Sequence, residues 1–128
     1  PKFIKLMIND KQPVIFGDGL QSRDFTYVKN VVEANLKACK TPEAAGHVFN
    51  IASGKSYNLL EMVKYINERL NKNIKPIFKE SRKGDVIHSL ADIYKANNIL
   101  EYKPLWDFVT GLNSVINRYI TAIKSINL

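Results

Sequence analysis

The chain has 128 residues, 45% hydrophobic and 24% charged, which is enough apolar material for one modest globular unit and argues against disorder. It has neither a run of about eighteen apolar residues nor an N-terminal charged-then-apolar signal pattern, so we expect no membrane span and no secretion, and predict a cytoplasmic protein. The formal net charge of +7 is compatible with nucleic-acid binding. However, the lysines are spread along the chain without a block of like charges, which favours a solvated basic surface or an anionic small-molecule ligand.

The first residues alternate between helical and extended patterns. Residues 3–8 have the apolar spacing of a helix. The apolar run 13–16 predicts a short strand, which the glycine turn 17–19 ends. Residues 24–28 are β-prone, and we expect them to be extended.

Apolar residues at intervals of three and four predict a helix over residues 28–39. Asn30 is placed to cap its start, and Pro42 ends it. Cys39 lies on the apolar side of this helix and has no partner for a disulfide, so we expect it to be buried packing material rather than a reactive group.

The second half of the chain continues the alternation. Residues 47–52 are apolar and β-rich, which is typical of a buried parallel strand. Residues 59–70 form an amphipathic pattern whose start carries Asn58 and, three positions on, Glu61, the signature of a capping box. Residues 74–79 predict another short strand.

Two further helices are predicted after the turn 81–85. Asp92 caps the first of them, with Ile93, Ala96 and Leu100 facing inward. The second is the most periodic segment of the chain and covers residues 105–123. Because strands and helices alternate, the sequence predicts an α/β fold.

Six short motifs occur in a fixed order along the chain. They are Pro-Val-Ile-Phe-Gly-Asp-Gly, Arg-Asp-Phe-Thr-Tyr-Val, Phe-Asn-Ile-Ala-Ser-Gly, Arg-Lys-Gly-Asp-Val, Ser-Leu-Ala-Asp and Leu-Glu-Tyr-Lys-Pro. In this order the chain resembles the C-terminal third of the extended short-chain dehydrogenase/reductase family, the NAD-dependent epimerases and dehydratases of nucleotide sugars. The resemblance implies the C-terminal substrate-binding portion of that fold, including a strand and a helix of its Rossmann half. Residues 1–128 are expected to act as a single unit, in which about 1–54 complete the Rossmann half and the nucleotide site and about 55–128 belong to the substrate domain.

Two parts of a complete enzyme of this kind are absent from the sequence. There is no glycine-rich turn between a strand and a helix, and none of the six tyrosines has a lysine four residues later. We therefore interpret the chain as a piece of a larger enzyme, inactive alone, whose NAD is bound by an N-terminal part that these residues do not include. No catalytic, cofactor-binding or metal-binding residue is assigned within the chain.

The residue types that a nucleotide sugar needs are nevertheless present. Arg23 and Arg82 offer guanidinium groups for phosphate oxygens, and Asp85 offers a carboxylate for ribose hydroxyls. By resemblance they match the diphosphate-binding arginines and the ribose-binding aspartate of the family, and residues 14–16 match its uracil pocket, which gives Val14, Ile15 and Phe16 as further substrate-binding residues. The simpler alternatives are a surface ion pair of Arg23 with an aspartate, an ordinary exposed turn around Arg82, and a plain core strand at 14–16.

The resemblance implies the UDP-sugar-binding portion of an NAD-dependent sugar-nucleotide 4-epimerase that works as a homo-oligomer and binds neither nucleic acid nor a membrane. Three alternatives stay open: a piece of a sugar-nucleotide 4,6-dehydratase or decarboxylase, a basic nucleic-acid-binding module, and an inert fragment. His47 and His88 have no acid or nucleophile near them in sequence, so we expect both to be structural. Asn30 stands where the family usually has aspartate.

Overall fold

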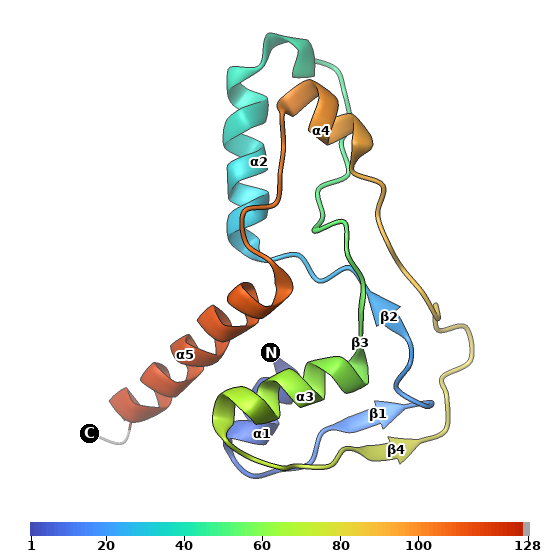
Figure 1. Cartoon of the computed structure of the whole chain (residues 1–128), viewed down its shortest axis with the longest axis vertical. Coiled ribbons are helices and arrows are strands. Elements are labelled where there is room, and N and C mark those ends of the chain that lie inside the picture. Colours follow the sequence, from blue (N-terminus) through green and yellow to red (C-terminus); the bar gives the residue numbers. More distant parts are fainter. Residues whose placement is uncertain (127–128) are drawn as a thin grey trace. The chain divides into compact units, whose positions relative to one another are not determined.

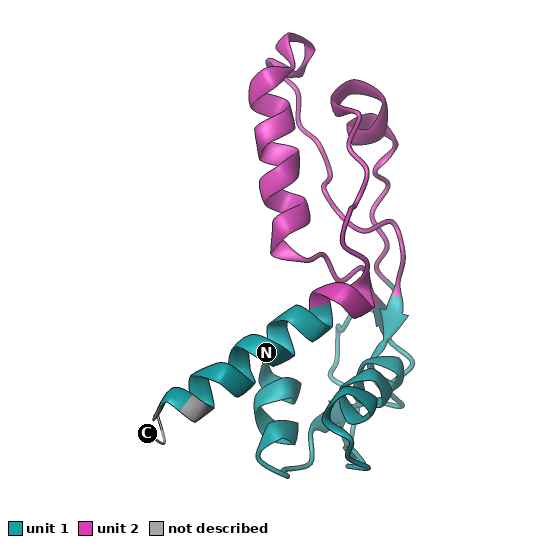
Figure 2. Ribbon diagram, turned by 60° about the vertical axis from the view of Figure 1, so that its left-hand side comes forward, with its two compact units in different colours: residues 1–22, 57–88, 112–128 teal, residues 23–56, 89–111 magenta. Residues whose placement is uncertain are grey.

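The computed structural model of the chain describes residues 1–126 and contains two compact units. Unit 1 consists of Pro1–Ser22, Tyr57–His88 and the helix residues from Leu112 onward, and unit 2 consists of Arg23–Ser56 and Ser89–Gly111 (Figure 2). The two units are therefore interleaved along the sequence. The division near residue 54, which refers to the domains of a complete enzyme, stays a prediction.

Unit 1 combines helices with two small sheets (Figure 1). Its elements are α1 (Lys2–Ile8), β1 (Val14–Phe16), β3 (Tyr57–Asn58), α3 (Leu59–Leu70), β4 (Ile77–Lys79) and most of α5 (Phe108–Ile126). Strand β1 pairs in parallel with β4, with Ile15 opposite Phe78, and β2 (Ser22–Arg23) pairs with β3. The helix predicted at 3–8 and the strand at 13–16 are confirmed, and the strand predicted at 74–79 is shorter at its start.

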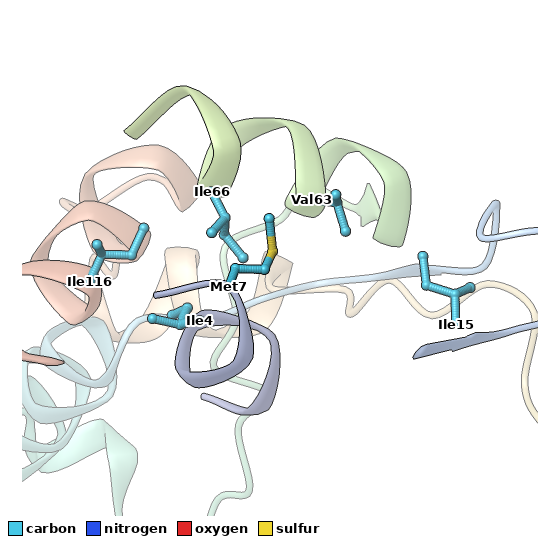
Figure 3. Packing of buried hydrophobic residues seen from close by; sticks show 6 residues of the cluster. All are labelled: Ile4, Met7, Ile15, Val63, Ile66 and Ile116. Atoms are coloured by element: carbon cyan, nitrogen blue, oxygen red, sulfur yellow. The ribbon is translucent and has the colours of Figure 1, made fainter. Parts of the chain in front are cut away.

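The core of unit 1 is built from one face of each helix and from β1. Its buried residues are Ile4, Met7, Ile15, Val63, Ile66 and Ile116. In Figure 3 the side chains of α1, α3 and α5 meet, and Val63 and Ile15 extend the cluster toward β1. These positions recur every three or four residues in the helices, so the periodic pattern of the sequence produces this core.

The start of α3 is fixed by the predicted capping box. The Asn58 side chain accepts a hydrogen bond from Glu61 N at 2.8 Å, and the Glu61 carboxylate accepts one from Asn58 N at 2.8 Å. Gly19 approaches the same helix end: its φ is +82°, and a Cβ there would lie 2.8 Å from Leu60 Cδ2. Glycine suits this turn for two reasons: other residues rarely adopt a positive φ, and a Cβ would collide with Leu60.

Unit 2 packs α2 (Val28–Lys40) and a short 3-10 turn (Pro42–Ala44) against α4 (Tyr94–Leu100). The buried residues of its hydrophobic cluster are Ala34, Ala96, Leu100 and Tyr102. The Tyr102 hydroxyl donates a hydrogen bond to Ala52 O at 2.8 Å. Burial, and secondarily the charge of Asp24, raises the pKa of Tyr102. Asp92 was predicted to cap α4, but the residue that precedes this helix is Ile93, and the Asp92 carboxylate accepts a hydrogen bond from Tyr94 N at 2.8 Å from one position further back.

One predicted strand is wrong. Residues 47–52 form no strand, and Val48 is 84% exposed. A parallel strand exists only beside a partner, and the described residues place none next to this segment. Residues 24–27, which were expected to be extended, belong to no strand, and the pairing in this region falls at β2, Ser22–Arg23; Tyr27 has an extended backbone, with a φ of −74° and a ψ of 139°.

Two predicted residue roles in α2 are also wrong. Asn30 lies inside the helix and is 1% exposed, whereas Tyr27 is the residue that precedes the helix. Cys39 is exposed, as are Val28, Val32 and Leu36. The helix packs its small residues Ala34 and Ala38 against the rest of unit 2, and its larger apolar side chains lie on the exposed side.

The last helix begins at Phe108, later than the predicted 105, and the Asp107 carboxylate accepts a hydrogen bond from Thr110 N at 2.7 Å at this start. Across residues 1–126, no helix is both long and apolar enough to cross a membrane.

Candidate functional site

A cavity of about 420 Å³ opens in unit 1 where the parallel pair β1 and β4 ends. Its volume lies within the range of small-molecule pockets. It is formed by the turn after β1 and by the exposed segment after β4. The lining residues are Phe16, Gly17, Asp18, Gln21, Ser81, Arg82, Asp85, Val86 and Ile87.

The backbone of the cavity is held by the strand ends. Gly17 N donates to Lys79 O at 2.8 Å and so extends the β1–β4 ladder by one bond into the turn. Gly17 has a φ of +87°, which lets the chain bend away from the sheet at this point. The Gln21 side-chain amide donates to Phe16 O at 2.6 Å and closes the turn over its own start.

Three chemically different groups face this cavity. The Arg82 guanidinium carbon lies 3.9 Å from the centroid of the Phe16 ring, a stacked cation–π contact. Stacking orients the planar guanidinium while its edge N–H groups stay available for an anion. Asp85 adds a carboxylate, and its N–H donates to Arg82 O at 3.2 Å across the turn in which Gly84 has a φ of +83°. The cavity therefore offers an aromatic wall, a cationic fork and an acidic acceptor.

The structure brings three of the predicted residues to this cavity: Phe16, Arg82 and Asp85. Ile15 is 0% exposed and packs in the core of unit 1, so its side chain fits the alternative of a plain core strand. Val14 is half-buried at the beginning of β1 and is not part of the cavity wall. The binding roles of all these residues stay predictions.

Arg23 is the first residue of unit 2 and follows Ser22 directly. The backbone is fixed on both sides of it: Ser22 N donates to Ile87 O at 2.8 Å in unit 1, and Asp24 N donates to Ser89 O at 3.0 Å in unit 2. The Asp24 carboxylate also accepts from Ser53 N at 2.8 Å and from Gly54 N at 2.9 Å. Asp24 is thus an anchor for the turn at residues 53–54, a role that the sequence did not reveal.

The sequence also missed residues that build the cavity. Gln21 holds the turn, and Val86 and Ile87 line the wall. His88 was predicted to be structural, and its ring nitrogen Nδ1 lies 2.9 Å from Ser22 Oγ. The signal for Gln21 was its place between the glycine turn and Arg23, but contacts between segments more than sixty residues apart have no signature in a single sequence.

Known proteins are similar to this chain over nearly its whole length. Residues 1–52 match the model of the NAD dependent epimerase/dehydratase family. The UDP-glucuronate 4-epimerase of Thermodesulfobacterium geofontis is 33% identical over 131 aligned positions, which cover 99% of this chain and 40% of that protein.

Solved structures agree with the fold. The crystal structure of a UDP-glucose 4-epimerase from Thermotoga maritima with UDP-glucose is 32% identical, with a TM-score of 0.89, over 95% of this chain and 39% of that one. A UDP-N-acetylglucosamine 4-epimerase from Methanobrevibacter ruminantium, in complex with UDP-N-acetylmuramic acid, is 36% identical with a TM-score of 0.87 over the same shares. The chain therefore spans about two fifths of the length of these relatives, and it has the fold of the C-terminal part of extended short-chain dehydrogenase/reductase epimerases. The sequence matches and the fold together show that this chain belongs to the NAD-dependent epimerase/dehydratase family.

Proposed function

We propose that this chain is the UDP-sugar-binding portion of an NAD-dependent sugar-nucleotide 4-epimerase, an isomerase. The observation that carries the proposal is the convergence of Phe16, Arg82 and Asp85 on one cavity of unit 1. A UDP-sugar presents a base, a diphosphate and a ribose. An aromatic face suits the base, a guanidinium suits the diphosphate, and a carboxylate suits the ribose hydroxyls. Arg23 is proposed as a second diphosphate ligand, and the backbone of residues 14–16 as a boundary for the base.

A grip of this kind suits a 4-epimerase. The hexose must turn between two orientations during such a reaction, so binding energy is best drawn from the nucleotide, which does not react. Most of the relatives described above and their like are named as UDP-sugar 4-epimerases. One similar protein, 28% identical, is named as a UDP-glucuronic acid decarboxylase of Arabidopsis thaliana. This balance supports epimerisation over decarboxylation.

The residues of this chain do not fit NAD by themselves. The turn at Gly17–Gly19 leads into strand β2 and not into a helix, so it lacks the strand–turn–helix cradle of a dinucleotide pyrophosphate. We therefore propose that NAD is held by a part of the enzyme outside these residues, that about 1–54 complete the cofactor half and that about 55–128 contribute to the substrate domain. A cytoplasmic location stays a prediction.

The proposal is tested by titrating the 128-residue chain with UDP in a calorimeter. We expect binding that Arg82→Ala weakens by about 1.5–3 kcal/mol, the scale of charge-assisted hydrogen bonds. Lys83→Ala, in the same exposed turn, is the matched control and should bind UDP as the unchanged chain does. Arg23→Ala should cost a similar amount if it is the second ligand.

Two results would count against the proposal. The first is UDP binding that Arg82→Ala leaves unchanged, which would remove the site from this cavity. The second is tight binding of single-stranded nucleic acid with a steep loss of affinity in salt, because a module that neutralises many phosphates releases many counterions. That result would favour the basic-module alternative.

A further inference from the structure

We propose that Ser22 and His88 are positioning residues of the nucleotide site. Their side chains form a clasp, defined here as the contact between Ser22 Oγ and His88 Nδ1, which holds the segment that carries Asp85 in its binding position. This inference rests on the proposed function, because it takes the cavity of unit 1 to be a nucleotide site.

The clasp is part of a set of contacts between two distant segments. The two atoms are 2.9 Å apart, and the residues form an isolated parallel bridge. In addition, Ser22 N donates to Ile87 O at 2.8 Å. Ser22 therefore holds His88 through its side chain and Ile87 through its backbone, and all three residues belong to unit 1.

The segment needs such a contact because it has no buried side chain. Every residue from 77 to 90 is exposed, including Asp85, Val86 and Ile87. Hydrophobic burial, which fixes the position of most segments, contributes little here. The hydrogen bonds to Ser22 consequently have a larger part in fixing the backbone that leads back to Asp85, three residues before His88.

Positioning matters because the ribose carboxylate must lie at hydrogen-bonding distance when the ligand arrives. A segment that is mobile in the free protein has to be ordered during binding, and the entropy lost in that step lowers the affinity. A clasp removes part of this cost in advance. Gln21, which precedes Ser22 and donates to Phe16 O, links the clasp to the aromatic wall of the same cavity.

The test compares two substitutions of His88 in the 128-residue chain, with UDP as the ligand. In His88→Leu the branched shape stays and the nitrogen is lost. In His88→Asn an amide group hangs from the same Cγ position, so a hydrogen bond to Ser22 Oγ can still form. We expect His88→Leu and Ser22→Ala to weaken UDP binding several-fold, and His88→Asn to bind within about twofold of the unchanged chain.

A double-mutant cycle separates positioning from a general structural effect. If the clasp acts through Asp85, adding His88→Leu to an Asp85→Ala chain, which has no ribose acceptor left to position, should cause little further loss of UDP affinity. Loss of the same size in both backgrounds would overturn the inference, as would UDP binding that neither His88→Leu nor Ser22→Ala changes. Amide NMR spectra of each variant verify that it is folded. If His88→Leu does not fold, the smaller substitution Ser22→Ala takes its place in the cycle.

The Arg82→Ala variant distinguishes the two levels of the proposal. UDP binding that depends on Arg82 but not on the clasp leaves the proposed function standing and rejects the clasp. UDP binding that is absent from the unchanged chain, or independent of Arg82, rejects the proposed function and the clasp with it.

Discussion

Asp107 caps the first turn of α5. Its carboxylate accepts a hydrogen bond from Thr110 N at 2.7 Å, and its carbonyl accepts one from Gly111 N at 3.0 Å. The backbone bond of Thr110, then its hydroxyl, and more weakly the charge of Lys55 hold the pKa of Asp107 below its ordinary value of 3.8. Because the pKa is lowered on folding, the stabilisation is present above pH 3.8 and is lost as the pH falls through the folded value.

We predict that Asp107→Ala lowers the free energy of unfolding by about 1 kcal/mol at pH 7, the usual cost of losing a helix cap. The difference from the unchanged chain should shrink as the pH falls below 3.8. Urea denaturation at several pH values measures both effects, with the exposed Glu80→Ala as a control for removing one negative charge. A destabilisation that does not vary with pH would show that the carboxylate is not responsible.

Only some residues of the candidate site could be predicted from the sequence. Arg82 and Asp85 stand in a turn whose glycine and charges are visible in the sequence, and Phe16 ends a clear apolar run. Ser22 and His88 gave no such signal, since their contact depends on how two segments 66 residues apart are brought together. Ile15 illustrates the opposite case: its motif position suggested a ligand contact, and its side chain is in the core.

At the scale of elements, α2 depends on one buried polar side chain. Asn30 donates to Trp106 O at 2.7 Å and accepts from Leu105 N at 3.0 Å and Trp106 N at 3.1 Å. These bonds satisfy three backbone groups of the segment that leads into α5. Asn30 is 1% exposed, and a buried polar side chain left without a partner is costly, so this single residue couples the helix to that segment.

We predict that Asn30→Ala lowers the free energy of unfolding by about 2–4 kcal/mol, because several backbone groups lose their partner at once. Asn30→Asp keeps the two acceptor bonds but places a carboxylate oxygen against Trp106 O, so it should recover only part of the lost stability. Chemical denaturation followed by circular dichroism gives both values. If the two variants are equally stable, the hydrogen bonds to Leu105 and Trp106 are not what holds α2 in place.

Helices were predicted better than strands for a physical reason. The apolar periodicity of α3 and α5 and the capping box at Asn58 are local signals, and the structure forms both helices. The segment 47–52 has the composition of a buried strand, but a strand needs a neighbour to bond with, and composition does not supply one. Asn30 was misassigned because asparagine near a helix start usually caps it, whereas here a distant segment competes for its amide.

At the scale of the whole molecule, unpaired apolar surface is the main feature. The outer side of α2 exposes Val28, Val32 and Leu36, each more than half, and Val48 is 84% exposed in a segment without a ladder. Surfaces of this kind mark interaction sites, and open backbone invites pairing with another chain.

We predict that the purified chain associates with itself in the micromolar range, through this surface or by pairing of open segments. Light scattering over a dilution series measures the mass. Val32→Lys combined with Leu36→Glu should shift the chain toward the monomer, whereas the exposed Thr121→Lys on α5 should not. A monomer at high micromolar concentration of the unchanged chain would contradict the prediction.

Because the two units are interleaved, their residues are completed in a fixed order during synthesis on the ribosome. The last segment of unit 2 ends at Gly111, whereas unit 1 still lacks the helix residues from Leu112 onward. Ile116, which is fully buried, belongs to that stretch, so α1 and α3 must keep an apolar face uncovered until the residues around Ile116 have been synthesised. Unit 2 is complete earlier, and the nascent chain passes through a stage in which the half that holds the cavity is the unfinished one.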